Sequence, residues 1–125
     1  MKRINPEKVW RSAAFSHATT NGTIMVLSGQ TGRDVNGNIV SDSFVDQARQ
    51  ALVNIKNIVE SQGKTMDDVM KITGYLKDLK YGKEYHKVRD EFFKPDKRPA
   101  STTVGVTALW DERLLIEIEA IVDMT

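Results

Sequence analysis

A long amphipathic segment in the middle of the chain constrains the fold more than any other feature. Apolar side chains recur at helical spacing from Phe44 to Val59, and polar side chains fall between them. Ser43 is a typical residue at a helix start, and Gly63 is a typical stop signal. A helix with one apolar face must bury that face against a sheet or another helix.

Segments with strand patterns lie on both sides of this helix. Asn21-Gly22 is a hairpin signal between the first two of them. A second helix is expected at 82–93, because Tyr85 and Val88 lie at helical spacing and Pro95 prevents its continuation. The expected strands cover residues 14–20, 22–30, 69–78, 100–108 and 114–122.

Two helices can cover only one face of such a sheet. The other face is partly apolar, because Ile121 on the last strand shares a side with Glu117 and Glu119. Ile24–Leu27 is apolar on both faces, which predicts a strand with neither side open to water. We therefore expect an α+β single domain over residues 1–125, with a mixed sheet, two helices on one face and a homo-oligomer that buries the other.

Composition excludes several classes of function. The absence of cysteine rules out disulfides, thiolate metal sites and a thiol nucleophile. A net charge of +1 gives no electrostatic case for binding nucleic acid or an anionic membrane. No metal-binding or phosphate-loop motif is present, so neither a metal nor a cofactor is expected. The N-terminus has no apolar segment after its basic pair, so we expect a cytoplasmic location.

Four stretches identify a resemblance that extends over nearly the whole chain. They are Ser28-Gly29-Gln30, 47–52, Arg98-Pro99-Ala100 and 116–121. In these stretches the chain resembles the Rid family, also called the YjgF family. The resemblance implies a chorismate-mutase-like (bacillary type) fold and a homotrimer with clefts between subunits. It also implies hydrolysis of 2-aminoacrylate and related 2-imino acids to 2-keto acids and ammonia, without a metal or cofactor.

One departure from the family pattern concerns the substrate carboxylate. In the deaminases of the family, an arginine that grips this carboxylate follows Pro-Ala, whereas here Ser101 follows Pro99-Ala100. A serine hydroxyl does not replace a bidentate, permanently charged group. Arg98 stands three residues earlier, so on a continuing strand it would point to the opposite face. The chain thus resembles the subgroups that lack the arginine, and we do not expect a standard 2-aminoacrylate deaminase.

Other site positions of the family can be matched to single residues of this chain. Glu117 matches the glutamate of the cleft, and Ser28 and Gly29 match directly. Phe15 stands at a tyrosine position and His86 at an asparagine position. Thr103 stands where the archetype has a small, nucleophile-like residue, a cysteine.

Each of these residues also has a plainer interpretation. Glu117 is either a general acid and base with a raised pKa or an interface carboxylate paired with Lys or Arg. Arg33 is either an anion contact that supplies the missing charge or a turn arginine paired with Asp34 or another group. His86 either lines the cleft or lies on the surface. Ser101 and Thr103 either bind a ligand or suit an interface, since neither has an adjacent base.

Three functions follow from these alternatives. The first is a cofactor-free hydrolase that acts on a small imine, enamine or related catabolic intermediate. In it, Glu117 orients water, while Arg33, Ser101, Thr103 and His86 shape the substrate site. The second is a non-catalytic trimer that binds metabolites. The third, RNA cleavage or translation inhibition, receives little support from a chain with no basic aromatic platform.

Overall fold

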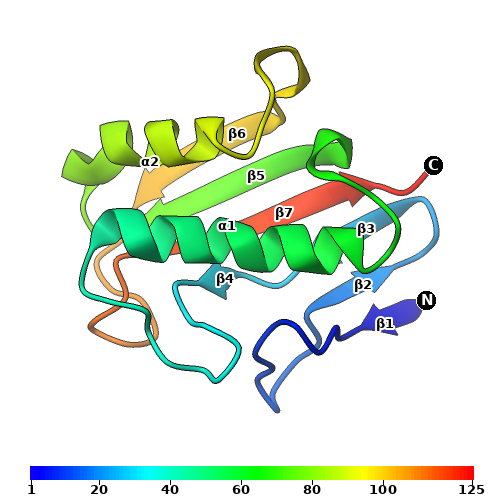
Figure 1. The fold of residues 1–125 in the computed structure, drawn as a ribbon, viewed down its shortest axis with the longest axis horizontal. Coiled ribbons are helices and arrows are strands. Elements are labelled where there is room, and N and C mark those ends of the chain that lie inside the picture. The colour runs from blue at the N-terminus through cyan, green and yellow to red at the C-terminus, as the bar shows by residue number, and fades with distance from the viewer.

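One mixed β-sheet organises the chain, and the computed structural model describes all of it, residues 1–125 (Figure 1). The strands are β1 (Lys2–Ile4), β2 (Ala18–Thr20), β3 (Ile24–Leu27), β4 (Gln30–Thr31), β5 (Val69–Leu76), β6 (Ala100–Gly105) and β7 (Ile116–Asp123). Their order in the sheet is β1-β2-β3-β7-β5-β6, and β4 also pairs with β7. β5 and β6 are parallel, whereas every other pair is antiparallel.

Two α-helices, α1 (Phe44–Glu60) and α2 (Gly82–Asp90), lie on the same face of this sheet (Figure 1). As predicted, the Ser43 hydroxyl caps α1 by accepting a hydrogen bond from the Asp46 backbone N–H. Gly63 follows the helix with φ of +73°, a conformation that glycine adopts without strain. Neither helix combines the length and the apolar character that a membrane span requires.

The sequence located most strands correctly but extended several of them too far. The hairpin at Asn21-Gly22 is confirmed, with Gly22 at φ of +90°, although its two strands are shorter than expected. Strand β1 was not predicted, because three residues beside β2 carry little pattern of their own. Met70 was expected on the face of Ile72 but is 50% exposed, because the pairing of β5 with β7 shifts register at this point.

Alternation along β7 separates the two faces of the sheet. Ile116 and Ile118 are buried under the helices, whereas Glu117 and Glu119 point to the other side. We call this other side the open sheet face. There Ile24 and Val26 are 37% and 41% exposed, so a single chain leaves one side of β3 in contact with water. Burial of these side chains by another copy remains a prediction.

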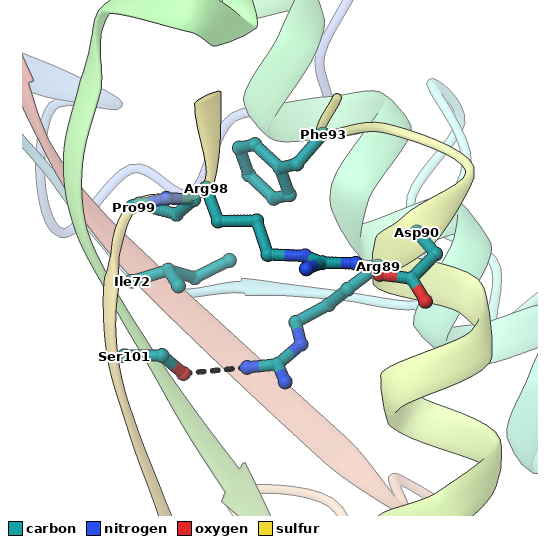
Figure 2. Close-up of a pocket in the computed structure, with 7 residues that line it drawn as sticks. All are labelled: Ile72, Arg89, Asp90, Phe93, Arg98, Pro99 and Ser101. Atoms are coloured by element: carbon teal, nitrogen blue, oxygen red, sulfur yellow. Dashed lines mark hydrogen bonds and ion pairs between the residues drawn. The ribbon is translucent and has the colours of Figure 1, made fainter. Parts of the chain in front are cut away.

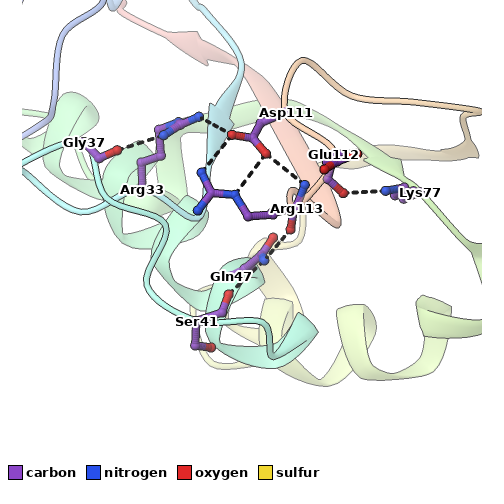
Figure 3. Close-up of polar contacts among 8 residues, drawn as sticks. All are labelled: Arg33, Gly37, Ser41, Gln47, Lys77, Asp111, Glu112 and Arg113. Atoms are coloured by element: carbon purple, nitrogen blue, oxygen red, sulfur yellow. Dashed lines mark hydrogen bonds and ion pairs between the residues drawn. The ribbon is translucent and has the colours of Figure 1, made fainter.

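Gln47 is a fully buried amide that ties α1 to the loop before β7. Its Nε2 donates to the carbonyls of Ser41 (2.9 Å) and Arg113 (3.0 Å), and its Oε1 accepts from the Leu115 N–H (2.8 Å). Figure 3 shows the first two of these contacts. Because all the polar atoms of this side chain are paired, the amide stabilises the position of the loop.

The Gln47→Leu substitution is expected to lower the free energy of unfolding by about 2–4 kcal/mol, because it leaves one buried N–H and two carbonyls without partners. Urea denaturation measures this loss. The matched control is Gln62→Leu, just after the same helix, whose side-chain hydrogen bonds are all exposed to solvent and which should cost less than about 1 kcal/mol. Equal losses in the two variants would contradict the bridging role of Gln47.

Candidate functional site

A hollow of about 410 Å³ lies at one end of the open sheet face, and we call it the Glu117 pocket. It brings together three of the residues that the sequence singled out, Glu117, Phe15 and Arg33. Its wall also includes Trp10, Ser12, Ala14, Thr31, Trp110 and Leu114. Segments that are far apart in the sequence therefore meet around one carboxylate.

Gly29 packs directly against this carboxylate. A β-carbon added at Gly29 would lie only 2.0 Å from Glu117 Oε2, so only glycine leaves room for the carboxylate in this position. The preceding residue, Ser28, donates its hydroxyl hydrogen to the carbonyl of Ser16 at 2.7 Å, which fixes the approach of the chain. Ser28 and Gly29 therefore shape this site by the position of their backbone, which leaves room for the Glu117 carboxylate.

The Glu117 carboxylate has no cationic partner within the chain, because none of the ion pairs involves it. Burial raises its pKa above the ordinary value of 4.5, and the negative charge of Glu119 adds to the effect. A carboxyl group with a raised pKa exchanges protons more readily near neutral pH. The environment of Glu117 thus suits a general acid and base.

Glu119, on the same side of β7, is held differently. Its Oε1 accepts a hydrogen bond from the Tyr75 hydroxyl on β5. This hydrogen bond is the main cause of the raised pKa of Tyr75, and desolvation by burial adds to it. The Tyr75 hydroxyl holds one oxygen of Glu119, whereas no side-chain hydrogen bond within the chain reaches the Glu117 carboxylate.

Arg33 lies at the edge of the Glu117 pocket, but its guanidinium group is already engaged (Figure 3). It donates to the Gly37 carbonyl at 2.8 Å and pairs with Asp111 at 3.5 Å, not with Asp34. It also lies 5.5 Å from the centre of the Trp10 ring. Asp111 stays ionised, because Arg113 lowers its pKa to about 2. These contacts hold the Arg33 side chain in place as part of the pocket wall.

The remaining predicted residues lie on the other side of the sheet. Ser101 pairs in register with the buried Ile72, and Thr103 with the buried Gly74, so both face the helices. His86 is exposed on α2, and no hydrogen bond or ion pair joins it to Ser101 or Thr103. Within one chain, the predicted site residues therefore lie on two opposite faces of the sheet.

Arg98 lies on the same side as Ser101, contrary to the expectation from strand alternation. Both residues line one small pocket between α2 and β6 (Figure 2). The physical reason is that β6 begins only at Ala100, while Arg98 ends the short helical turn Pro95–Lys97. The alternation of a continuous strand therefore does not apply to Arg98.

Arg89 is the residue that the motif comparison missed. Its Nη1 donates to the Ser101 Oγ at 2.5 Å (Figure 2). Its guanidinium also lies 4.7 Å from the centre of the Tyr85 ring. The helical spacing of Tyr85 and Arg89 is the signal that could have placed both on the sheet-facing side of α2.

No group of three or more His, Cys, Asp or Glu side chains is arranged to hold a metal ion. The Glu117 pocket offers a carboxyl group, the hydroxyls of Ser12 and Thr31, and aromatic walls. These groups can orient a water molecule and transfer its proton.

Comparison with known proteins defines the class to which this fold and site belong. Residues 7–124 match the protein family described as Endoribonuclease L-PSP. A RutC family protein of Pyrococcus horikoshii is 41% identical over 108 residues, which cover 86% of this chain and 84% of the relative. The 2-iminobutanoate/2-iminopropanoate deaminase of Dermatophagoides farinae is 37% identical over 109 residues, with the same shares of the two chains.

Comparison of the fold with solved structures indicates the same class of protein. The crystal structure of the YjgF gene product of E. coli superposes with a TM-score of 0.92, at 29% sequence identity, and each chain covers 100% of the other. The chain therefore belongs to the Rid (YjgF) family and has its α+β fold.

Proposed function

We propose that this protein is a cofactor-free hydrolase of small imines or enamines, in which Glu117 orients and activates the attacking water. The observation that carries the proposal is the Glu117 pocket, which holds an unpaired carboxylate with a raised pKa in a hollow of about 410 Å³. A pocket of this size accommodates a small metabolite together with a water molecule. The name of the Dermatophagoides farinae relative supports the same reaction class.

The reaction requires only proton transfers and one addition. Glu117 accepts a proton as the water oxygen bonds to the imine carbon, and the electron pair of the C=N bond moves to nitrogen, which takes up a proton. The hydroxyl proton of the resulting carbinolamine then passes to nitrogen through Glu117, and ammonia leaves as the C–N bond breaks and a C=O bond forms. An enamine enters the same path after protonation at carbon. One imine and one water thus give one carbonyl compound and one ammonia.

The proposal includes assembly between copies of the chain, as a homotrimer. Ser101 and Glu117 lie on opposite faces of the sheet, so a small substrate cannot touch both within one copy. Trp110 is 98% exposed and Phe15 is 52% exposed at the rim of the Glu117 pocket, which indicates a surface that a neighbour covers. We place the complete cleft, with its small-molecule substrate, between subunits of a cytoplasmic protein that needs neither nucleic acid nor a membrane as partner.

The test follows the hydrolysis of imines that are generated in place. An amino-acid oxidase and an amine oxidase supply carboxylate-bearing and neutral imines, and semicarbazide traps whatever is not hydrolysed. We expect the protein to suppress semicarbazone formation with at least one of the two kinds of imine. No suppression with either, combined with thermal stabilisation by the corresponding carbonyl compounds, would favour a non-catalytic, metabolite-binding trimer instead.

A further inference from the structure

Three aromatic side chains line the Glu117 pocket, and the proposed proton transfers use none of them. They are Trp10, Phe15 and Trp110, three of the nine residues that form its wall. The hollow of about 410 Å³ lies in the size range of sites that hold drug-sized ligands, so it has room for more than a few carbon atoms. Its aromatic wall offers a binding surface for an apolar part of the substrate.

Trp10 is held by three contacts, although it is not buried. The Arg33 guanidinium lies 5.5 Å from the centre of its ring. Gly37 packs against the edge of the indole, since a β-carbon added there would lie 2.5 Å from Trp10 Nε1. The Trp10 carbonyl hydrogen-bonds with Nε2 of the buried His17 at 2.8 Å. Trp10 is nevertheless 42% exposed, so a ring that is fixed in place keeps part of its surface free for a ligand.

The group that supports this ring is itself fixed. The Arg33 guanidinium donates to the Gly37 carbonyl and pairs with Asp111, as Figure 3 shows, so it is not free to follow a moving ring. An aromatic ring that is oriented before binding loses little conformational entropy when a ligand packs against it. Aromatic pairs are also stronger than their buried area alone predicts. A fixed indole therefore favours a ligand that carries an aromatic ring.

We propose that Trp10 is a specificity-determining residue, and that the Glu117 pocket selects substrates with an aromatic ring, which packs against the indole. The substrate class is then an imine or enamine that carries an aryl group, and the products are an aryl-substituted carbonyl compound and ammonia. This substrate class rests on the proposed hydrolysis, whereas the preference of the pocket for an aromatic ring does not.

Isothermal titration calorimetry with phenylacetone and cyclohexylacetone tests the proposal without turnover, because these uncharged ketones share one carbon skeleton and differ in aromaticity. Wild type is expected to bind phenylacetone about three- to tenfold more tightly. Trp10→Leu should reduce this preference to less than about twofold, because leucine keeps an apolar contact and has no π-system. The matched control is Phe92→Leu, which removes a partly buried ring outside the pocket and should keep the preference.

Gly37→Ala is a second variant, which keeps the indole but displaces it. The new β-carbon would meet the ring at 2.5 Å, so the preference for phenylacetone should fall as in Trp10→Leu. Its matched control is Gly63→Ala, because φ is +73° at Gly63 and +84° at Gly37, yet a β-carbon at Gly63 has no atom within 4 Å. Gly63→Ala should keep the preference, and thermal unfolding shows that each variant is folded.

Tryptophan fluorescence locates the bound ketone, because the chain has two tryptophans, Trp10 and Trp110, and both line the pocket. Phenylacetone should change this emission in wild type over the same concentrations as in calorimetry. No saturable binding of phenylacetone by wild type, equal affinities for the two ketones, or an unchanged preference in folded Trp10→Leu overturns the proposal. If the preference depends on Trp10 while no imine is hydrolysed, the aromatic selection stands and the proposed hydrolysis fails.

Discussion

Glu117→Gln should lower kcat/KM for imine hydrolysis by about a hundredfold or more, the usual contribution of a positioned general acid and base. The amide keeps the shape of the side chain but cannot accept a proton from water. The carboxylate is the one titratable group with a raised pKa in the Glu117 pocket, so no neighbour there replaces it. The assay is the semicarbazide competition with purified, folded protein.

Glu112→Gln is the matched control for this prediction. Glu112 is exposed in the loop before β7, so the substitution removes the same charge without altering the pocket. It should leave kcat/KM within about twofold of wild type. If Glu117→Gln kept most of the activity, the attacking water would have to be activated elsewhere, and the role given to Glu117 would be wrong.

Glu117→Gln should also change the stability of the protein, by an amount that depends on pH. The pKa of Glu117 is raised on folding, so the folded state binds this proton more tightly than the unfolded state. The contribution of Glu117 to stability is therefore present below its ordinary pKa of 4.5 and is lost as the pH rises through the folded value. Glu117→Gln should thus be more stable than wild type at pH 8, and this advantage should disappear at pH 4.

Gly29→Ala should also abolish most of the activity while leaving the fold intact. The new β-carbon would meet the Glu117 carboxylate, with its nearest atom at 2.0 Å and the carboxyl carbon at 2.8 Å. The end of a side chain can move away, whereas backbone cannot, so the carboxylate should leave its position and the sheet should remain. We expect a loss of about a hundredfold in kcat/KM, as for removal of the carboxylate itself.

Gly82→Ala is the matched control for the Gly29→Ala variant. Gly82 is the first residue of α2, and an added β-carbon there has no atom within 4 Å. Alanine favours the helix, so this variant should be as stable as wild type or slightly more so, with full activity. A fully active Gly29→Ala variant would show that the position of the carboxylate next to Gly29 is not the one used in the reaction.

The sequence was informative wherever local chemistry decides the structure. The Ser43 cap and the apolar spacing of α1 appear in the structure as predicted, and Asn21-Gly22 forms its hairpin. The Glu117 pocket was partly predictable as well. The resemblance assigned Glu117 and Phe15 to one cleft, Arg33 was expected in a loop near it, and all three line the pocket.

The errors arose where tertiary pairing overrides local pattern. The alternation along β5 was interrupted at Met70 by a register shift against β7, which no periodicity reveals. The side of Arg98 was inferred from the alternation of a continuing strand, but the strand begins only at Ala100. Arg89 was overlooked because it reaches Ser101 from another element, and a residue-by-residue comparison along the sequence does not detect a charge supplied from across the fold.

The place of β7 in the sheet has a consequence for how the protein is made. This strand comes last along the chain, yet it lies between β3 and β5 and pairs with both. On the ribosome, β1–β3 can pair with one another and β5 with β6, but the two parts of the sheet stay separate until residues 116–123 emerge and join them. Glu117 arrives on that same strand, and a nascent chain therefore acquires its candidate catalytic group only in the step that completes its fold.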